Sequence, residues 1–294
     1  MHSFYRAIGF SKYTTKSEQD KLINLSISKP TSRQITHITA DTELVQINHQ
    51  FGHGMGISVI GEYDPEHVFH IDHAFPYCLG EFGTPESDIQ IEKHADKDAY
   101  SGLSDDYNLG MTLIYSLQNV VDYVKSTWLN SFCRIPKEVY FGALSIEGRV
   151  LCGIQLDHIV NPYDKHPISN KERKELIERA RAGDLDALEN LTLDDMDTYS
   201  FVSKRIKDED LFTVVETYFM PYGIDNEQYA ILGIIQDITE ITNDFSGEMV
   251  YNIIVTCNDM NLNVTINSLD LQGEPMIGRR FKGIVWLQGL VEFL

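Results

Sequence analysis

The sequence predicts an α+β fold of largely antiparallel sheets with a few helices, whose C-terminal part is a coiled sheet or small barrel. Three observations carry this prediction. Apolar and polar residues alternate with a period of two between residues 43 and 73, and they do so again in the last third of the chain. A few separate stretches instead repeat apolar residues at helical spacing. The composition, with 43% hydrophobic and 23% charged residues, is that of an ordinary globular protein.

The N-terminal part begins with a short strand-like or irregular element, which a helix follows. Thr15 or Ser17 supplies the N-cap of this helix, and Pro30 ends it. A meander of strands is then expected between residues 43 and 73. The glycine-rich residues 51–56 connect two of these strands rather than cradling a phosphate, because no helix follows them.

The next stretch mixes strands with one helix. A strand is expected near residues 89–91, and the charged residues 92–106 are expected to form a surface loop. A strand over residues 111–115 leads into a helix over residues 117–128, which carries apolar residues on one face. A hairpin then follows, with its arms at 139–146 and 150–154 and its turn at Glu147 and Gly148.

Two prolines at residues 161–167 punctuate the chain and divide it into two predicted domains. Residues 1–160 are expected to form an N-terminal α+β domain, and residues 161–294 a helical segment followed by a C-terminal β domain. The helical segment opens with a capping box at residues 169–172. A second capped helix start is expected at residues 192–195.

The last third is predicted to be β structure again. Asn263, Thr265 and Asn267 alternate with apolar residues and are expected to form the water-facing side of a strand. Glycines spaced through the final strand permit sharp bends or close backbone approach, as in a small barrel. The predicted strands cover residues 211–219, 229–241, 251–257, 262–267 and 278–293.

The charge balance limits the partners of the chain. There are 44 acidic and 24 basic residues, which give a formal net charge of −20. Such a field repels nucleic acid and anionic membrane surfaces, so neither is expected as a partner. A protein or a small molecule is the expected partner, although solubility alone also explains the charge.

The cysteines and the N-terminus favour the cytoplasm. Cys78, Cys133, Cys152 and Cys257 lie far apart in the sequence, which excludes a zinc knuckle and indicates no disulfide framework. Such cysteine usage fits a reducing compartment. The first residues have no continuous apolar core of a signal peptide, and no run is long enough to span a membrane.

Five histidines crowd between residues 49 and 73 and raise the hypothesis of a divalent metal site. His67, His70, Asp72 and His73 carry the imidazole and carboxylate groups that zinc, iron and manganese bind. On a regular strand, His70 and Asp72 point to one face and His67 and His73 to the other. Unless a bulge intervenes, the four side chains therefore diverge, and satisfied or solvent-exposed histidines are the alternative. No other cofactor is expected.

Arg279, Arg280 and Lys282 form the densest basic cluster near the C-terminus. They are candidates for contact with an anion or an acidic partner. They fit equally well the neutralisation of carboxylates within the same molecule. A serine-hydrolase elbow of the form Gly-x-Ser-x-Gly is absent from the sequence.

Several stretches together resemble one protein family. They are residues 1–11 (Met-His-Ser-Phe-Tyr-Arg-Ala-Ile-Gly-Phe-Ser), 194–199 (Asp-Asp-Met-Asp-Thr-Tyr), 219–223, 273–283 and 286–289. The resemblance is to an uncharacterised family of anaerobic Gram-positive bacteria, known only as a domain of unknown function, and it runs over nearly the whole chain. It implies a bacterial, cytosolic protein and supplies no catalytic residues.

The sequence leaves two main functional hypotheses. The first is a non-catalytic binding or regulatory protein that meets its partner through sheet faces or through the charged helical residues 169–210. The alternative is a metal-dependent, hydrolase-like enzyme that uses the His67–His73 cluster with donors from elsewhere. An enzyme fold that has lost its chemistry is a third reading, which the sequence does not separate from the first.

Overall fold

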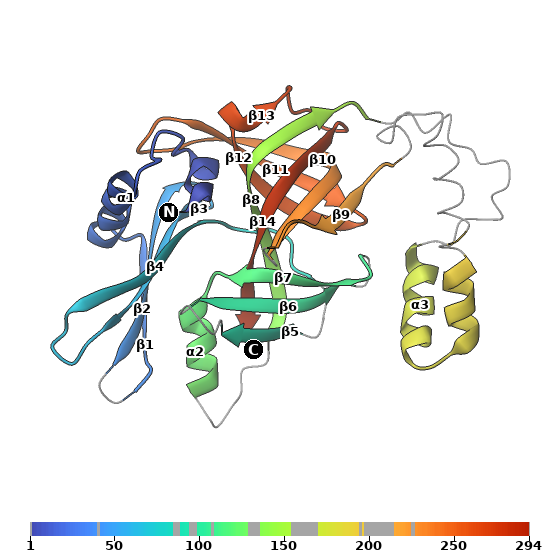
Figure 1. Cartoon of the computed structure of the whole chain (residues 1–294), viewed down its shortest axis with the longest axis horizontal. Helices are drawn as coiled ribbons and strands as arrows, with labels where there is room; N and C mark the ends of the chain where they lie inside the picture. The colour runs from blue at the N-terminus through green and yellow to red at the C-terminus, as the bar shows by residue number, and fades with distance from the viewer. Residues whose placement is uncertain are drawn as a thin grey trace.

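The computed structural model describes residues 2–39, 42–84, 89–93, 99–106, 109–128, 136–153, 170–193, 196, 215–224 and 227–293. It confirms an α+β fold with two largely antiparallel sheets and a few helices (Figure 1). No helix in these ranges is both long enough and apolar enough to cross a membrane.

The first sheet is the expected meander. Its order is β1-β2-β3-β4, and every pair is antiparallel. Helices α1 and α2 both contact it. Thr15 caps α1 as expected, because its Oγ1 accepts from the backbone N–H of Glu18 at 3.3 Å while the Glu18 carboxylate accepts from the backbone N–H of Thr15 at 2.9 Å. The elements are α1 (Lys16–Ser28), β1 (Ser32–His37), β2 (Glu43–Gly52), β3 (Met55–Tyr63), β4 (Phe69–Cys78) and α2 (Val120–Trp128).

The second sheet contains the other ten strands. Most of its neighbours are antiparallel, whereas β8 pairs with β12 and β13, and β7 with β14, in parallel. The strands are β5 (Ile89–Lys93), β6 (Tyr100–Asp106), β7 (Met111–Leu117), β8 (Pro136–Leu151), β9 (Tyr218–Pro221), β10 (Gln228–Thr242), β11 (Met249–Cys257), β12 (Met260–Asn267), β13 (Leu271–Gln272) and β14 (Arg280–Phe293).

Five strands of this sheet pair in a closed ring, in the order β8, β12, β11, β10, β14 and back to β8. The ring is not a clear barrel, because β10 pairs with β14 through residues 228–234 and with β11 through residues 234–242. The prediction of a coiled C-terminal sheet therefore describes it better than that of a small barrel.

Both predicted domains contribute to the second sheet. β5 to β8 precede residue 160, β9 to β14 follow it, and β8 pairs with β12, β13 and β14. The buried apolar side chains of both parts also form one cluster. The predicted boundary itself falls in residues 154–169, outside the described ranges.

The two sheets join where the chain leaves β4 and crosses β8. A Cβ atom on Gly142 would overlap the carbonyl oxygen of Cys78, and one on Gly80 would lie 2.7 Å from the backbone nitrogen of Phe141. Because these neighbours are backbone atoms, no side chain fits between the two segments. Glycine at both positions lets the backbones approach this closely.

Buried glutamines satisfy the backbone groups at this junction. The Nε2 of Gln118 donates to the carbonyl of Cys78 at 2.7 Å and to Oε1 of Gln288 at 3.0 Å. Gln288 in turn donates to the carbonyl of Pro76 at 2.8 Å. Gln46 donates to the carbonyl of Gln118 at 2.6 Å. Polar side chains are thus placed in the core, where they bind main-chain carbonyls near the ends of β4 and β7.

Between residues 92 and 154, two expected elements are wrong. Part of the loop expected over residues 92–106 is strand β6, whose Gly102 lies directly against the ring of Tyr115, so that a small residue lets the strand pack closely. The hairpin expected around Glu147 and Gly148 is one continuous strand, β8. Gly148 is opposite Gly283 of β14 and Leu271 of β13, and pairing on both sides keeps it extended.

The side of β12 that was expected to face water is buried. Asn263, Thr265 and Asn267 are 0%, 2% and 0% exposed. Segments far away in the sequence cover them. Asn263 exchanges hydrogen bonds with Glu81, which follows β4, and Asn267 donates to the carbonyl of Arg6 at 3.2 Å. The alternation correctly predicted a strand, but the burial of its polar side depends on segments that are distant in the sequence.

The N-terminus is a 3-10 helix, η1 (Ser3–Ile8), where a short strand-like or irregular element was expected. Its apolar side chains are part of the core, and Gly9 ends it at φ 92°, in the left-handed region that glycine adopts readily. A second short 3-10 helix, η3 (Ser268–Asp270), follows β12.

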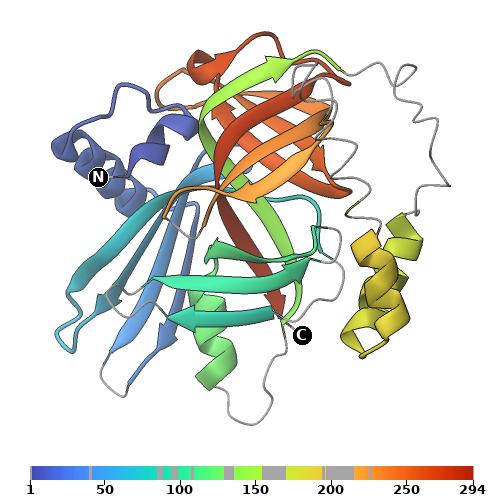
Figure 2. The same ribbon diagram turned by 45° about the vertical axis from the view of Figure 1, so that its right-hand side comes forward.

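A helical hairpin stands apart from the two sheets (Figure 1), and Figure 2 shows the same separation from a second direction. It consists of α3 (Asn170–Arg181) and a second helix over residues 185–193. The second helix begins earlier than expected. Its N-cap is Asp184, whose Oδ1 accepts from the backbone N–H of Asp186 at 3.0 Å and of Ala187 at 3.2 Å. Thr192 lies inside the helix, not at its start.

Candidate functional site

The predicted metal ligands lie on the β3–β4 hairpin, near its exposed tip. His70 Nε2 is 2.8 Å from Oδ2 of Asp64, and this hydrogen bond lowers the pKa of the Asp64 carboxyl, helped by the backbone N–H groups of Val68 and Glu66. His67 occupies the turn before β4 with φ 58°. His70 therefore already has a carboxylate partner, Asp64, which is not one of the four predicted ligands.

A β-bulge interrupts the alternation at this place. Ile60 pairs with His73 and Gly61 with Ile71, which leaves Asp72 as the extra residue. His73 stacks on Phe75, with ring centroids 5.8 Å apart. Within the described ranges, no three His, Cys, Asp or Glu side chains gather in an arrangement that holds a metal ion. The geometry does not bring the four predicted ligands together, and the metal site stays a hypothesis from the sequence.

The predicted basic cluster makes contacts inside the molecule. Arg280 is 5% exposed, and it donates from Nε to the carbonyl of Cys152 and from Nη1 to the carbonyl of Val215, both at 3.0 Å. Arg279 donates to the carbonyl of Glu274 at 2.9 Å. Lys282 is half-buried. Two of the three cations are thus bonded to main-chain carbonyls of the same chain, which are neither an external anion nor the carboxylates of the internal alternative.

Arg280 binds both ends of the segment between β8 and β9, which we call the excursion. Cys152 follows β8, Val215 precedes β9, and the helical hairpin lies between these two positions in the sequence. One guanidinium therefore holds the outgoing and the returning segment of the chain together. Burial lowers the pKa of Arg280, whereas the charge of Glu216 raises it. An arginine remains protonated in such surroundings, so the fastening persists at physiological pH.

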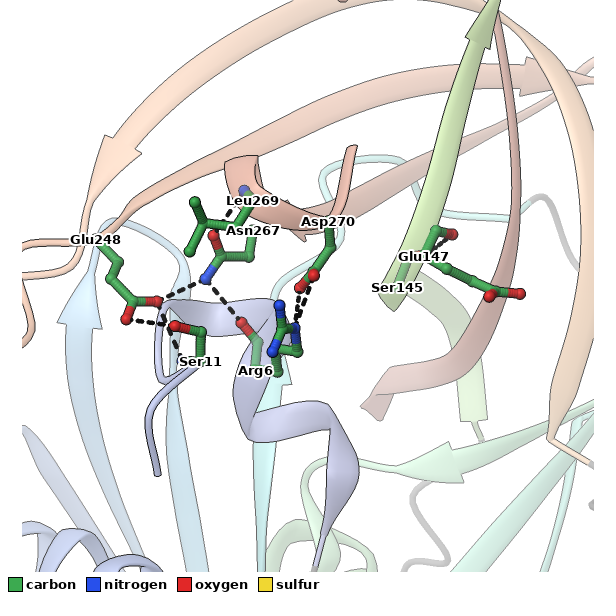
Figure 3. A network of polar contacts seen from close by, with 8 residues as sticks. All are labelled: Arg6, Ser11, Ser145, Glu147, Glu248, Asn267, Leu269 and Asp270. Carbon is green, nitrogen blue, oxygen red and sulfur yellow. Dashed lines mark hydrogen bonds and ion pairs between the residues drawn. The ribbon is translucent and has the colours of Figure 1, made fainter. Parts of the chain in front are cut away.

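A second polar network holds the N-terminal segment against the ring of strands (Figure 3). Asn267 donates to Oε2 of Glu248 at 2.7 Å, and the hydroxyl of Ser11 donates to the other oxygen of this carboxylate at 2.7 Å. Arg6 forms an ion pair with Asp270 at 2.5 Å. These groups satisfy one another, so the network anchors the chain rather than offering free donors to a ligand.

Ser145 and Glu147, also drawn in Figure 3, lie apart from this network on β8. The hydroxyl of Ser145 donates to the carbonyls of Glu147 and Ile284, both at 2.8 Å. The pairing of β8 with β14 shifts at this place, since Val285 is opposite Ser145 and Ile284 is opposite Glu147. The side chain thus satisfies carbonyls that a bulge leaves without ladder partners.

Burial makes two of the thiols poor nucleophiles because it raises their pKa. Burial raises the pKa of Cys78 and of Cys257 to about 12. The thiolate is the nucleophilic form, so neither side chain is activated at neutral pH. Cys152 is exposed, and Cys133 lies outside the described ranges.

We expect Cys152 to react with a thiol reagent in the native protein while Cys78 and Cys257 stay protected, because both are buried and protonated. Mass spectrometry of peptides after brief alkylation at about pH 8 follows each cysteine separately. The denatured chain is the control, in which all of them react. Labelling of native Cys78 as fast as Cys152 would contradict the burial.

The same shifts make stability depend on pH. The unfolded chain ionises its thiols near pH 8.5, whereas the folded thiols stay protonated to about pH 12. Their stabilisation is therefore complete below about pH 8.5, and each thiol lowers the free energy of unfolding by about 1.4 kcal/mol per pH unit above it. Urea titrations between about pH 8 and about pH 10 measure this slope. Cys257→Ala is expected to remove the contribution of one thiol, about 1.4 kcal/mol per pH unit.

The second helix of the hairpin exposes a set of large apolar side chains. Leu185, Leu188, Leu193 and Met196 are 77%, 53%, 54% and 61% exposed, and we call these four residues the hairpin face. At 100° per residue, the three leucines lie on one side of the helix over residues 185–193, and Met196 is also helical. Ala187, on the opposite side, is fully buried. The helix thus buries Ala187 and partly buries Leu191, while these large apolar side chains stay exposed.

The spacing of apolar residues in the sequence indicates this face, but the helix start expected at residues 192–195 obscured it. Leu185 and Leu188 are three residues apart, and Leu193 and Met196 repeat that spacing. The helix start expected at residues 192–195 cut this pattern in two. An earlier start, at Asp184, would have shown one apolar stripe opposite Ala187.

Comparisons with known proteins give a family and no activity. Neither the curated proteins nor the solved structures contain a match to the chain. A family model does match residues 5–289, nearly the full length, and its description reads "Domain of unknown function, E. rectale Gene description (DUF3881)". The match confirms the resemblance to an uncharacterised domain family, and the chain belongs to the DUF3881 family.

Proposed function

We propose that this protein is a non-catalytic binding protein that engages a partner protein through the hairpin face. The observation that carries the proposal is the exposure of the three leucines on one side of a helix that stands away from both sheets, together with the exposure of Met196. Contiguous exposed apolar surface is unfavourable in water and marks interaction sites. A helix with such a face binds partners through residues spaced three and four apart.

The base of the excursion fits this role. A docking element needs a defined position, and Arg280 bonds the two ends of the excursion, after β8 and before β9. An ion pair between Arg181 and Asp105, 3.7 Å apart, adds a contact between the hairpin and the end of β6. The hairpin thus contacts the second sheet beside its turn, and its large apolar side chains remain exposed.

The chemistry of the described side chains supports binding over catalysis. Hydrogen bonds from neighbouring groups lower the pKa of the carboxyl groups of Glu18, Asp64 and Asp184. A general acid at neutral pH needs the opposite shift. We also propose that the protein works in the cytoplasm, which the free thiols of Cys78, Cys152 and Cys257 support.

Affinity capture from a lysate of the organism that makes the protein tests the proposed function. The bait is the full chain, compared with the double variant Leu185→Glu/Leu188→Glu. We expect at least one specific partner to be lost with the double variant, because charges in the contact disfavour its burial. Ile277→Glu is the matched control, since Ile277 is also exposed (68%) but lies in the loop before β14. Identical partners for all three baits would contradict the proposal.

A further inference from the structure

The hairpin face contains acidic side chains as well as apolar ones. Asp186 and Glu189 are both exposed, and residues 185–193 include neither lysine nor arginine. At 100° per residue, Glu189 falls between Leu185 and Leu193 on the helix surface, and Asp186 falls beside Leu193. Asp184 differs from them, because Arg179 already binds it at 2.6 Å. In the described part of the chain, neither Asp186 nor Glu189 forms a salt bridge.

The position of Glu189 limits what can cover the hairpin face. Any partner that buries Leu185 and Leu193 also removes water from the Glu189 carboxylate between them. Burial of a carboxylate without a cation or hydrogen-bond donors is strongly unfavourable. A second copy of the same face would bring two such carboxylates together. A purely apolar partner would leave one carboxylate unpaired.

We propose that the hairpin face binds a basic amphipathic helix of another protein. Apolar side chains of that helix cover the leucines and Met196, and lysines or arginines along its border pair with Glu189 and Asp186. This inference rests on the proposed function and specifies the partner. The net charge of −20 favours the same choice, because it attracts a cationic partner at long range and disfavours anionic surfaces.

Peptide binding by the full chain tests the specificity directly. The probe is a fluorescently labelled helical peptide of about 18 residues, with leucines on one face and lysines at its borders. A second peptide carries glutamates in place of the lysines, and a third has the composition of the first in scrambled order. Fluorescence anisotropy is expected to show the lysine peptide binding at least about tenfold more tightly than either of the others.

Charge reversal on the protein provides the sharpest variant. Asp186→Lys/Glu189→Lys is expected to exchange the preference, so that the glutamate peptide binds more tightly than the lysine peptide. Leu185→Glu/Leu188→Glu is expected to weaken both, and Ile277→Glu to leave both unchanged. Circular dichroism and thermal unfolding establish that each variant is folded. Equal binding of the scrambled and ordered lysine peptides, or no exchange after charge reversal, would overturn the inference.

The outcomes separate this inference from the proposed function. If capture depends on Leu185 and Leu188 while the lysine peptide binds no more tightly than the other two peptides, the proposed function is supported, and the inference of a basic partner is overturned. If the purified chain forms dimers that Leu185→Glu/Leu188→Glu abolishes, the occupant is a second copy, and the inference is overturned. If neither capture nor peptide binding responds to these two residues, both proposals fail.

Discussion

Replacing Gly142 by alanine is expected to lower the free energy of unfolding by about 3 kcal/mol, which corresponds to roughly 6–12 °C in the melting temperature. The added Cβ would overlap the carbonyl oxygen of Cys78, a backbone atom that cannot rotate away. Moving that carbonyl also disturbs its 2.7 Å hydrogen bond from Gln118. The damage falls where the two sheets join, and urea unfolding with thermal denaturation measures it.

Gly148 supplies the matched control, because it lies on the same strand. There a Cβ would lie 2.7 Å from Phe281, 2.8 Å from Ile266 and 3.1 Å from Leu271, and each nearest atom is at the far end of a side chain. Such ends can shift, so Gly148→Ala is expected to cost about 1 kcal/mol. Equal losses at Gly142 and Gly148 would show that the backbone crossing is not the special constraint.

Replacing Asn267 by aspartate is expected to destabilise the protein by about 3 kcal/mol at neutral pH. The amide of Asn267 donates to Glu248 at 2.7 Å and to the carbonyl of Arg6 at 3.2 Å, and it is 0% exposed. A carboxylate at this position loses both donations and faces a like charge on Glu248. The N-terminal segment and the end of β12 then separate more readily, which chemical unfolding detects.

The penalty at Asn267 carries a pH signature. Two neighbouring carboxylates in a partly buried site have a raised pKa in the folded state, because one of them must stay protonated to donate to the other. The penalty is therefore small below the unfolded pKa of about 4 and grows as the pH rises through the folded value. Lowering the pH from about 7 to about 5 is expected to bring Asn267→Asp closer to the wild type.

Asn261 is the control for this experiment. It is exposed on the same strand, and its side-chain oxygen accepts from the hydroxyl of Thr256 at 2.6 Å. Aspartate keeps that acceptor and remains solvated, so Asn261→Asp is expected to change stability by less than about 0.5 kcal/mol with little pH dependence. A pH-independent loss at Asn267 would exclude the carboxylate pair as its cause.

Local rules predicted most elements but missed those that depend on neighbours. Thr15 and Glu18 cap α1 through atoms three residues apart, so the sequence contains everything that positions them. Gly148 has the composition of a turn, but β13 and β14 hold it in a strand. Gly102 likewise lies in β6 opposite Tyr115, and a side chain at this position would overlap the tyrosine ring.

The candidate sites show the same division. The sequence identified His67, His70, Asp72 and His73 as metal donors but could not show the bulge at Asp72 or the Asp64 partner of His70. It identified Arg280 as an anion contact or an internal cation, and only the fold brings the carbonyls of Cys152 and Val215 to its guanidinium. Helical spacing would have predicted the hairpin face if the helix start had been placed at Asp184.

The sequence by itself determined the α+β class, the strand periodicity, the acidic charge and the family resemblance, because each depends on composition or on residues a few positions apart. Only the tertiary structure decided that the polar side of β12 is buried and that one guanidinium fastens a distant excursion. It also decided which apolar side chains of the hairpin remain exposed. Burial is a property of what covers a residue, and the covering segments here lie far away along the chain.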